Sequence, residues 1–234
     1  RRNVEIEAGD ARLKLRYADS LLFLYAIQIQ RGRIKEAGSS AFDAMQIAEG
    51  LFQQDPTNSE WMMTFGQAKL NHAIASQDNA GPDLQAAESL IYKAHKLNPK
   101  DERTADLLAK VFIAQGQSAL SQGDTDSAAQ SAYDAFMVIE PKWKMQANED
   151  LRLRKAQILL LQGRIALKNG NRPEAEMKLQ SAVGLLEENA GGELPFTRLD
   201  DLVRALELAG KPDRAVEYKK RLKASGFVPL QPYP

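Results

Sequence analysis

A glycine followed five residues later by an alanine occurs five times, and successive glycines are 49, 42, 47 and 40 residues apart. Each glycine stands between two long stretches with helical spacing of apolar residues. We therefore expect each to be the left-handed residue that ends one helix. Each alanine then lies in the first turns of the next helix, where a small side chain lets two helices approach closely. The period predicts a series of helical hairpins. The pairs are Gly32 and Ala37, Gly81 and Ala86, Gly123 and Ala128, Gly170 and Ala175, and Gly210 and Ala215.

Prolines stand between successive hairpins at Pro56, Pro99 and Pro141. Because proline cannot continue a helix, each is expected to end the second helix of a pair. Asn-Gly and Asp-Gly hairpin turns between alternating apolar runs are missing from the sequence, so strands are not expected. The predicted fold is an all-α solenoid of about five antiparallel hairpins. The expected helices span 10–31, 35–54, 58–77, 83–97, 101–122, 125–139, 147–169, 172–188, 196–209 and 212–224.

The fourth unit resembles a tetratricopeptide repeat, because seven of its residues follow that family's order of large and small side chains. They are Leu159, Gly163, Ala166, Gly170, Ala175, Leu179 and Ala182. The third unit repeats this order from Phe112 through Gly116 to Ala135, and the fifth follows it in part from Leu199 to Leu222. The units are longer than the family's period of about 34 residues. The resemblance therefore implies a tetratricopeptide-like array with lengthened helices.

The expected domain organisation is one repeat domain over residues 1–226 and a C-terminal tail over 227–234. The hairpins of that domain are expected at approximately 10–54, 58–97, 101–139, 147–188 and 196–224. Three prolines keep the tail from forming another helix, so its apolar residues should fold back over the fifth hairpin or dock on another molecule. The Asp55-to-Trp61 segment and the closing Arg221-to-Pro229 segment also resemble the C-terminal repeat regions of multidomain bacterial signalling proteins.

Composition excludes several classes of protein. The formal net charge is zero, whereas a protein that neutralises many phosphates carries an excess of positive charge, so nucleic-acid binding is not expected. The chain has no cysteine, which excludes disulfides, cysteine-bound zinc and thiol nucleophiles. Its longest apolar run, Leu21 to Ile27, is far shorter than the roughly 20 residues of a membrane-spanning helix. No insertion of this segment into a membrane is therefore expected.

A catalytic site is not predicted. The sequence has no phosphate-binding loop, dinucleotide-binding glycine pattern, nucleophile elbow or zinc-binding His-Glu-x-x-His motif. The two histidines, His72 and His95, have no ligand-type partner one helical turn away, so no metal is expected. Adjacent carboxylates such as Asp200 and Asp201 point in different directions from a helix and are interpreted as solvated. The chain is therefore predicted not to be an enzyme and to need no cofactor.

The resemblance implies a binding groove lined by the first helix of each hairpin. The register of the turn glycines places eight residues toward it: Lys110, Ile113, Gln117, Gln157, Leu160, Arg164, Lys168 and Arg204. The family's carboxylate-clamping set of lysines and asparagines is not present. Trp143, between two lysines after Pro141, is the candidate exposed aromatic anchor, with packing as the alternative.

Charge is segmented along the chain. Residues 101–140 hold seven acidic and two basic side chains, whereas 142–178 hold nine basic and four acidic ones. This pattern indicates either attraction between neighbouring hairpins or a basic patch for an acidic partner. Arg164 and Lys168, four apart on one helical face, would carry such a patch.

The leading hypothesis is a non-catalytic scaffold or sensor module that binds a protein or peptide, within a larger bacterial signalling or effector protein. The alternative is a self-association module that clusters an attached effector domain, and a helical enzyme is the third choice. The chain begins at Arg1 without a methionine, which suggests a segment of a longer protein. The compartment stays open: the cytoplasm is favoured, and the periplasm requires an upstream membrane anchor.

Overall fold

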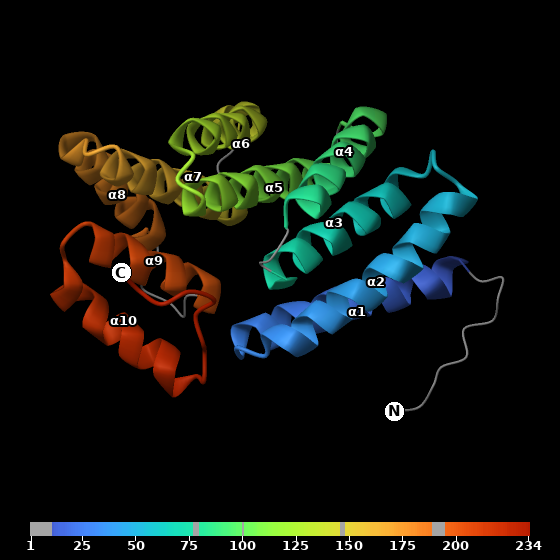
Figure 1. The fold of residues 1–234 in the computed structure, drawn as a ribbon, viewed down its shortest axis with the longest axis horizontal. Coiled ribbons are helices and arrows are strands. Elements are labelled where there is room, and N and C mark those ends of the chain that lie inside the picture. Colours follow the sequence, from blue (N-terminus) through green and yellow to red (C-terminus); the bar gives the residue numbers. More distant parts are fainter. Residues whose placement is uncertain (1–10, 77–79, 100, 146–147, 189–194) are drawn as a thin grey trace. The chain divides into compact units, whose positions relative to one another are not determined.

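The computed structural model describes residues 11–76, 80–99, 101–145, 148–188 and 195–234, and all regular secondary structure in these ranges is helical. The helices form antiparallel hairpins, so the predicted all-α fold is confirmed (Figure 1). The array of helical hairpins that the tetratricopeptide resemblance implies is what the structure contains. The described helices are α1 (Ala11–Gln30), α2 (Ile34–Gln54), α3 (Ser59–Ser76), α4 (Gly81–Leu97), α5 (Glu102–Ser121), α6 (Thr125–Met145), α7 (Glu149–Lys168), α8 (Arg172–Glu187), α9 (Phe196–Leu208) and α10 (Pro212–Ala224).

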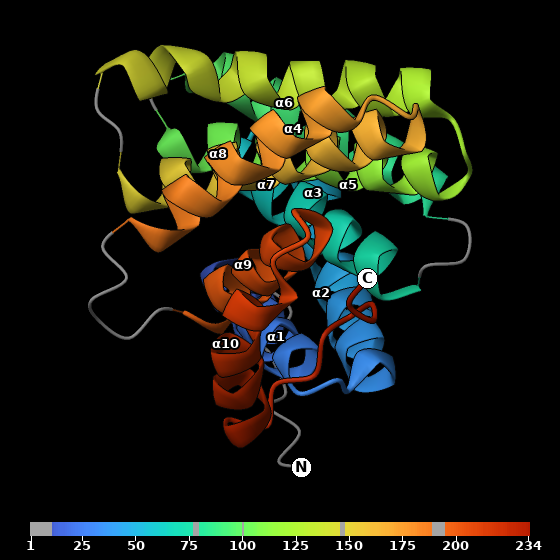
Figure 2. The ribbon, with the colours of Figure 1, turned by 90° about the vertical axis from the view of Figure 1, so that its left-hand side faces the viewer.

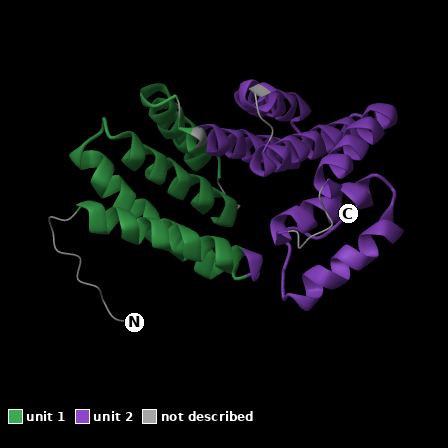
Figure 3. Ribbon diagram, turned by 180° about the vertical axis from the view of Figure 1, so that it is seen from behind, with its two compact units in different colours: residues 1–29, 33–104 green, residues 30–32, 105–234 purple. Residues whose placement is uncertain are grey.

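The chain divides into two compact units (Figure 3). Unit 1 consists of residues 1–29 and 33–104, and unit 2 of residues 30–32 and 105–234. The boundary at 104/105 lies inside α5, so this helix belongs mainly to unit 2. A single repeat domain over residues 1–226 stays a prediction.

Unit 1 contains three small clusters of buried apolar side chains. Two of them join α1, α2 and α3, and the third joins α2, α3 and α4. Alanines supply much of this core, which lets the helices pack at short range. Central pairs in the three clusters are Leu22 with Ala44, Tyr25 with Ala41, and Phe65 with Leu90.

Unit 2 also contains three clusters of buried apolar side chains, one of them larger than any in unit 1. Two clusters join α5, α6 and α7, and a third extends over α7, α8, α9 and α10. The helices of the α7–α8 and α9–α10 hairpins lie side by side in both views (Figures 1 and 2). The third cluster also takes in Phe227 and Tyr233, so part of the tail covers the apolar end of the last hairpin.

Four of the five turn glycines have the left-handed backbone that the sequence predicts. Gly32, Gly123, Gly170 and Gly210 have φ between 67° and 85°. Gly81 does not: it is the first residue of α4. The second hairpin therefore follows another register, and its buried alanine is Ala87 rather than the predicted Ala86.

Glycines in the middle of three first helices allow close contact with a neighbouring helix. A Cβ atom on Gly163 would lie 2.7 Å from Cγ of Leu179 in α8, and one on Gly116 would lie 2.6 Å from Cδ2 of Leu161 in α7. Gly66 has the same role against Ile91 of α4, at 2.6 Å. The sequence indicated Gly116 and Gly163 as sites of close contact. It did not indicate Gly66, because this residue lies 15 residues before Gly81 instead of seven before a turn glycine.

Helix α6 continues past Pro141 to Met145, whereas the sequence predicts its end at residue 139. An internal proline removes one helical hydrogen bond and crowds the preceding turn, but it does not prevent continuation where later residues compensate. Here Lys144 pairs with Glu140 across the proline, with 2.9 Å between Nζ and Oε1. The basic residues Lys142 and Lys144 also lie in the last turn, where they complement the helix dipole.

A buried guanidinium joins three helices of unit 2. Arg198, only 3% exposed, donates from Nε to the carbonyl oxygen of Leu186 at 2.9 Å and from Nη1 to Oε1 of Glu149 at 2.8 Å. It also donates to the carbonyls of Leu185 and Glu188. The positive charge thus lies at the carboxyl end of α8, where the helix dipole favours it, and links α8 and α9 to the first turn of α7.

Candidate binding face of unit 2

The candidate groove residues of unit 2 come from its first helices, α5, α7 and α9. Polar side chains on these helices form a chain of contacts that runs from one helix to the next. On α5, Nζ of Lys110 lies 2.7 Å from Oδ2 of Asp106. The other oxygen of Asp106 accepts from Nε of Arg154 on α7, at 2.6 Å. We call the surface formed by α5, α7 and α9 the first-helix face.

The chain of contacts continues from α7 to α9. Arg154 also donates from Nη1 to Oε1 of Gln157. Nε2 of Gln157 then donates to Oδ2 of Asp201 on α9, at 2.7 Å. The predicted groove residue Gln157 therefore bridges α7 and α9, whereas Lys110 pairs within its own helix, and each already has a partner within the chain.

The two carboxylates at the ends of this chain have opposite pKa shifts. Burial raises the pKa of Asp106, but the positive charges of Arg154 and Lys110 outweigh it, so the pKa lies below the ordinary value. At Asp201 burial dominates, with the Asp200 charge adding to it against the Gln157 hydrogen bond, and the pKa rises to about 6. Asp106 is thus an ordinary ion-pair partner, whereas Asp201 carries an unfavourable charge at neutral pH.

Two of the predicted groove residues are part of the core. Ile113 and Leu160 are each 6% exposed and lie in apolar clusters. Ile113 packs with Ile139 of α6, and Leu160 belongs to the cluster that α8 and α9 complete. Burial of apolar side chains is favourable wherever a neighbouring helix covers them, and these positions are covered. Gln117, in contrast, is exposed.

Arg164 and Lys168 lie on α7, where Arg164 is half-buried and Lys168 is exposed. Neither has an acidic partner among the residues that the structure describes. Burial, helped by the positive charge of Arg204, lowers the pKa of Arg164 below its ordinary value. The structure therefore gives Arg164 a partly desolvated charge and no counter-ion in the described part of the chain.

The last predicted groove residue, Arg204, is engaged by the tail. Its Nε lies 3.1 Å from Oδ2 of Asp200, and its Nη2 donates to the carbonyl oxygen of Gln231 at 2.6 Å. Nη1 donates to the carbonyl oxygen of Pro232 at 3.3 Å. Of the two alternatives for the tail, folding back over the fifth hairpin is what the structure shows.

Asp200 and Asp201 were interpreted from sequence as solvated, and this is wrong. Both are partly buried, and each accepts from different groups: Asp200 from Arg204 and Tyr233, Asp201 from Gln157. The one available signal was the spacing of Asp200 and Arg204, four residues apart with opposite charge. No sequence signal linked Asp201 to Gln157, which lies 44 residues away.

Trp143 lies in the last turns of α6, not in a loop. It is half-buried, and the ammonium of Lys155 on α7 lies 3.9 Å from the centre of a ring of its indole. That contact is a cation–π interaction, which favours packing of the indole between α6 and α7. The alternative of packing is therefore the better description of this residue.

The histidines belong to unit 1 and make local contacts. Nδ1 of His72 lies 2.7 Å from Oδ2 of Asp83, whose other oxygen accepts from Lys69 at 3.0 Å. Burial raises the pKa of Asp83, but these two partners outweigh it and hold the pKa below its ordinary value. His95 contacts the hydroxyl of Thr104 at 2.8 Å. Within the described ranges no three His, Asp or Glu side chains gather as metal ligands do, and no helix is long and apolar enough to cross a membrane.

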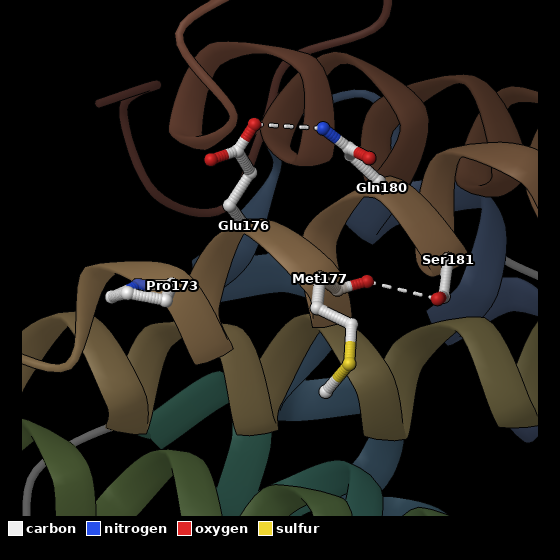
Figure 4. Close-up of a pocket in the computed structure, with 5 residues that line it drawn as sticks. All are labelled: Pro173, Glu176, Met177, Gln180 and Ser181. Atoms are coloured by element: carbon white, nitrogen blue, oxygen red, sulfur yellow. Dashed lines mark hydrogen bonds between the residues drawn. The ribbon is translucent and has the colours of Figure 1, made fainter.

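A shallow depression on α8 offers no converging chemistry (Figure 4). It is lined by residues of this helix alone, and its hydrogen bonds join residues one turn apart: Gln180 to Glu176 at 2.9 Å and Ser181 to the carbonyl of Met177 at 2.8 Å. Groups from a second helix are absent from its lining. The first-helix face therefore remains the candidate binding surface.

Comparisons with known proteins assign the chain to no family. No family model matches it, and no curated protein matches it. Among solved structures it is similar to MamA, with a TM-score of 0.39 and 14% identity, covering 92% of this chain and 100% of that one. It is also similar to PilF of Pseudomonas aeruginosa, with a TM-score of 0.42 and 16% identity, covering 91% of this chain and 93% of that one.

Proposed function

We propose that the chain is a non-catalytic scaffold or sensor module that binds a protein or peptide, within a larger signalling or effector protein. Its binding surface is the first-helix face, and its partner is acidic. The mechanism is recognition by side chains on packed helices, which lose little conformational entropy on binding.

One observation carries the proposal: the basic residues of α7 differ in what they contact, and Lys155 in the amino half lies over the Trp143 ring. Toward the amino end, Arg152 lies 3.4 Å from a carboxylate oxygen of Glu188, and Arg154 pairs with Asp106. Arg164 and Lys168 have no acidic partner in the described part of the chain. Attraction between the acidic and basic segments thus accounts for Arg154 but leaves the carboxyl half of α7 with uncompensated charge.

Of Arg164 and Lys168, Arg164 supplies the better contact for an acidic partner. A guanidinium that has already lost part of its hydration gains more from a carboxylate than a fully exposed ammonium does. Gln117 and Lys168 are exposed and would make contacts at the rim of this surface. Lys110, Gln157 and Arg204 contribute only where a partner replaces their present contacts.

The test is a double charge reversal, Arg164→Glu with Lys168→Glu, in the full chain. The probe is a fluorescein-labelled glutamate-rich peptide, with binding measured by fluorescence anisotropy at 50 and 200 mM salt. We expect the affinity to fall at least tenfold. Most of the difference in affinity between the two salt concentrations should also disappear, because exposed charges are screened over about 8 Å at physiological salt. The matched control, Lys220→Glu with Lys223→Glu on exposed positions of α10, should bind as the unchanged chain does.

Melting temperatures separate the alternatives in the same experiment. A reversal that binds the probe normally but melts earlier would assign the two cations to the fold and remove this binding surface. Equal losses in the α10 control would show that only the overall charge matters.

Self-association is the second candidate, and an apolar face on α1 favours it. Phe23 is 70% exposed, and Leu13, Tyr17 and Leu24 are also exposed on this helix. Exposed apolar clusters of this kind are typical of interaction surfaces. Sedimentation velocity at several protein concentrations tests the self-association candidate, since a monomer at all concentrations excludes self-association of this chain.

A further inference from the structure

The C-terminal tail is held on α9 and α10 by contacts of the kind that bind a peptide, and the amide of Val228 also donates to the carbonyl of Gln30 at 3.0 Å. After α10 the backbone turns at Gly226, with φ of 74°, and the amide of Phe227 donates to the carbonyl of Leu222 at 3.0 Å. The Phe227 ring then lies 6.3 Å from the Phe196 ring at the start of α9. From here residues 228–234 continue without regular helix or strand.

The end of the tail contacts three charged residues. One guanidinium, that of Arg204, donates to two successive main-chain carbonyls, those of Gln231 and Pro232. The hydroxyl of Tyr233 donates to Oδ1 of Asp200 at 2.8 Å. Arg204 and Lys219 each lie 5.1 Å from the centre of the Tyr233 ring.

These contacts divide into general and selective ones. Hydrogen bonds to main-chain carbonyls recognise any extended segment, whereas a carboxylate that accepts from a phenol selects tyrosine over phenylalanine. Burial and the Asp200 hydrogen bond raise the pKa of Tyr233 above its ordinary value, so the hydroxyl stays protonated and donates. The cations beside the ring add cation–π attraction for an aromatic side chain.

The sequence of the tail suits this mode of binding. Pro229, Pro232 and Pro234 fix φ near −65° and remove amide donors, so the segment favours an extended form that presents mainly carbonyl acceptors. Val228, Gln231 and Pro232 are exposed, so the tail lies on the surface rather than in the core. Only Phe227 and Tyr233 of the tail pack against the apolar cluster.

We propose that the α9–α10 surface formed by Asp200, Arg204 and Lys219 is a binding site for an extended peptide segment that carries a tyrosine between prolines. Residues 231–234 are its intramolecular occupant, and an external segment of the same chemistry competes with them. We call this surface the tail site. It shares Arg204 with the first-helix face, whereas the acidic-partner proposal rests on Arg164 and Lys168 of α7.

The tail site also explains why Arg204 is engaged by contacts within the chain. Although the sequence predicts this residue in the binding groove, its guanidinium already donates to two carbonyls of the tail, so a partner must replace the tail to take over these contacts. A tethered segment has an effective concentration in the millimolar range, so it masks the site from weak external ligands. The tail therefore sets the affinity threshold that a partner must exceed.

The experiment compares full chains that differ in how firmly the tail is held. The probe is a fluorescein-labelled peptide with the sequence of residues 227–234, and its dissociation constant is measured by fluorescence anisotropy. Tyr233→Ala should bind the probe at least tenfold more tightly than the unchanged chain, because its own tail no longer competes. Adding Arg204→Gln to Tyr233→Ala should abolish that gain.

Two matched controls define the site. Arg214→Gln, which removes an equal charge from a residue of α10 that pairs with Glu187 at 2.5 Å, should leave probe binding unchanged in the Tyr233→Ala background. A probe with phenylalanine in place of the tyrosine should bind two- to fivefold more weakly, because it lacks the hydroxyl that donates to Asp200. Equal binding of the two probes would overturn the contact that selects tyrosine.

Folding and association are checked on the same samples. Should Tyr233→Ala lose its helical circular dichroism, Tyr233→Phe carries the test, since it removes only the hydroxyl and should raise probe affinity two- to fivefold. Equal probe affinity for the unchanged chain and these variants would overturn the proposal. A dimer of the unchanged chain that Tyr233→Ala dissociates would also overturn it, because the tail would then occupy a second copy.

Discussion

Asp201 shows how one side chain can make the stability of this fold depend on pH. Its pKa in the folded chain is about 6, against an ordinary value of 3.8. Between these two values the folded state holds a proton that the unfolded state has lost. The free energy of unfolding therefore falls as pH rises from about 4 to 6, and the loss is complete above the folded pKa.

We expect Asp201→Asn to remove this dependence. The variant keeps a side-chain oxygen that can accept from Gln157 and carries no charge, so at pH 7 its free energy of unfolding should exceed that of the unchanged chain by about 1–3 kcal/mol. At pH 4 the two should be nearly equal. Denaturant titrations at pH 4, 5, 6 and 7 measure the difference, and a constant difference over this range would contradict the expectation.

At the scale of helices, the close approach at Gly163 decides how tightly α7 and α8 pack. A Cβ atom at this position would meet Cγ and Cδ2 of Leu179 at 2.7 and 2.8 Å, and Leu179 is itself 1% exposed. A buried leucine between packed helices has little room to move, so even one added methyl group must shift a neighbour.

We expect Gly163→Ala to destabilise the chain by about 1–3 kcal/mol, and Gly163→Leu by more. The matched control is Gly184→Ala in α8, where an added Cβ meets no atom within 4 Å. There the change should stabilise by about 0.4–1 kcal/mol, because alanine loses less conformational freedom in a helix than glycine does. Thermal unfolding followed by circular dichroism compares the two, and shifts of the same sign would contradict the packing argument.

At the scale of the whole molecule, the helices differ in how many of their residues are buried. In α9, six of the 13 residues are buried, whereas in α1 only four of 20 are. The cluster around α9 also draws on α7, α8, α10 and the tail. Local opening is easier where a helix has few buried contacts.

Hydrogen exchange should therefore differ along the chain. We expect the slowest amides in α7, α8 and α9, and faster exchange in the central turns of α1. Mass spectrometry of peptides from native-state exchange measures this order. Protection of α1 equal to that of α9 would show that the chain opens as one cooperative unit.

The candidate site could be predicted only in part, and its residues show why. The register of the turn glycines placed Arg164, Lys168, Gln117 and Arg204 on first helices. It could not separate them from Ile113 and Leu160, which share that register but have apolar side chains that a neighbouring helix covers.

The sequence by itself determined the all-α fold and the hairpins. Glycine and alanine spacing act locally: a left-handed glycine ends a helix wherever it occurs, and helical periodicity needs only neighbouring residues. The sequence predicts a turn at Gly81 and a helix end at Pro141, and both predictions are wrong. There the flanking residues allowed the helix to form in spite of that pattern.

Only the tertiary structure decided which charges are paired and which are open. Asp106 meets Arg154 across 48 residues of sequence, Gln157 meets Asp201 across 44, and the tail meets Arg204 across 27 and 28. Such pairs depend on how helices pack. Packing also decides the pKa of each carboxylate: nearby cations outweigh burial at Asp106, whereas burial outweighs them at Asp201. The occupied tail site and the unpaired Arg164 follow from that packing, which no local pattern in the sequence encodes.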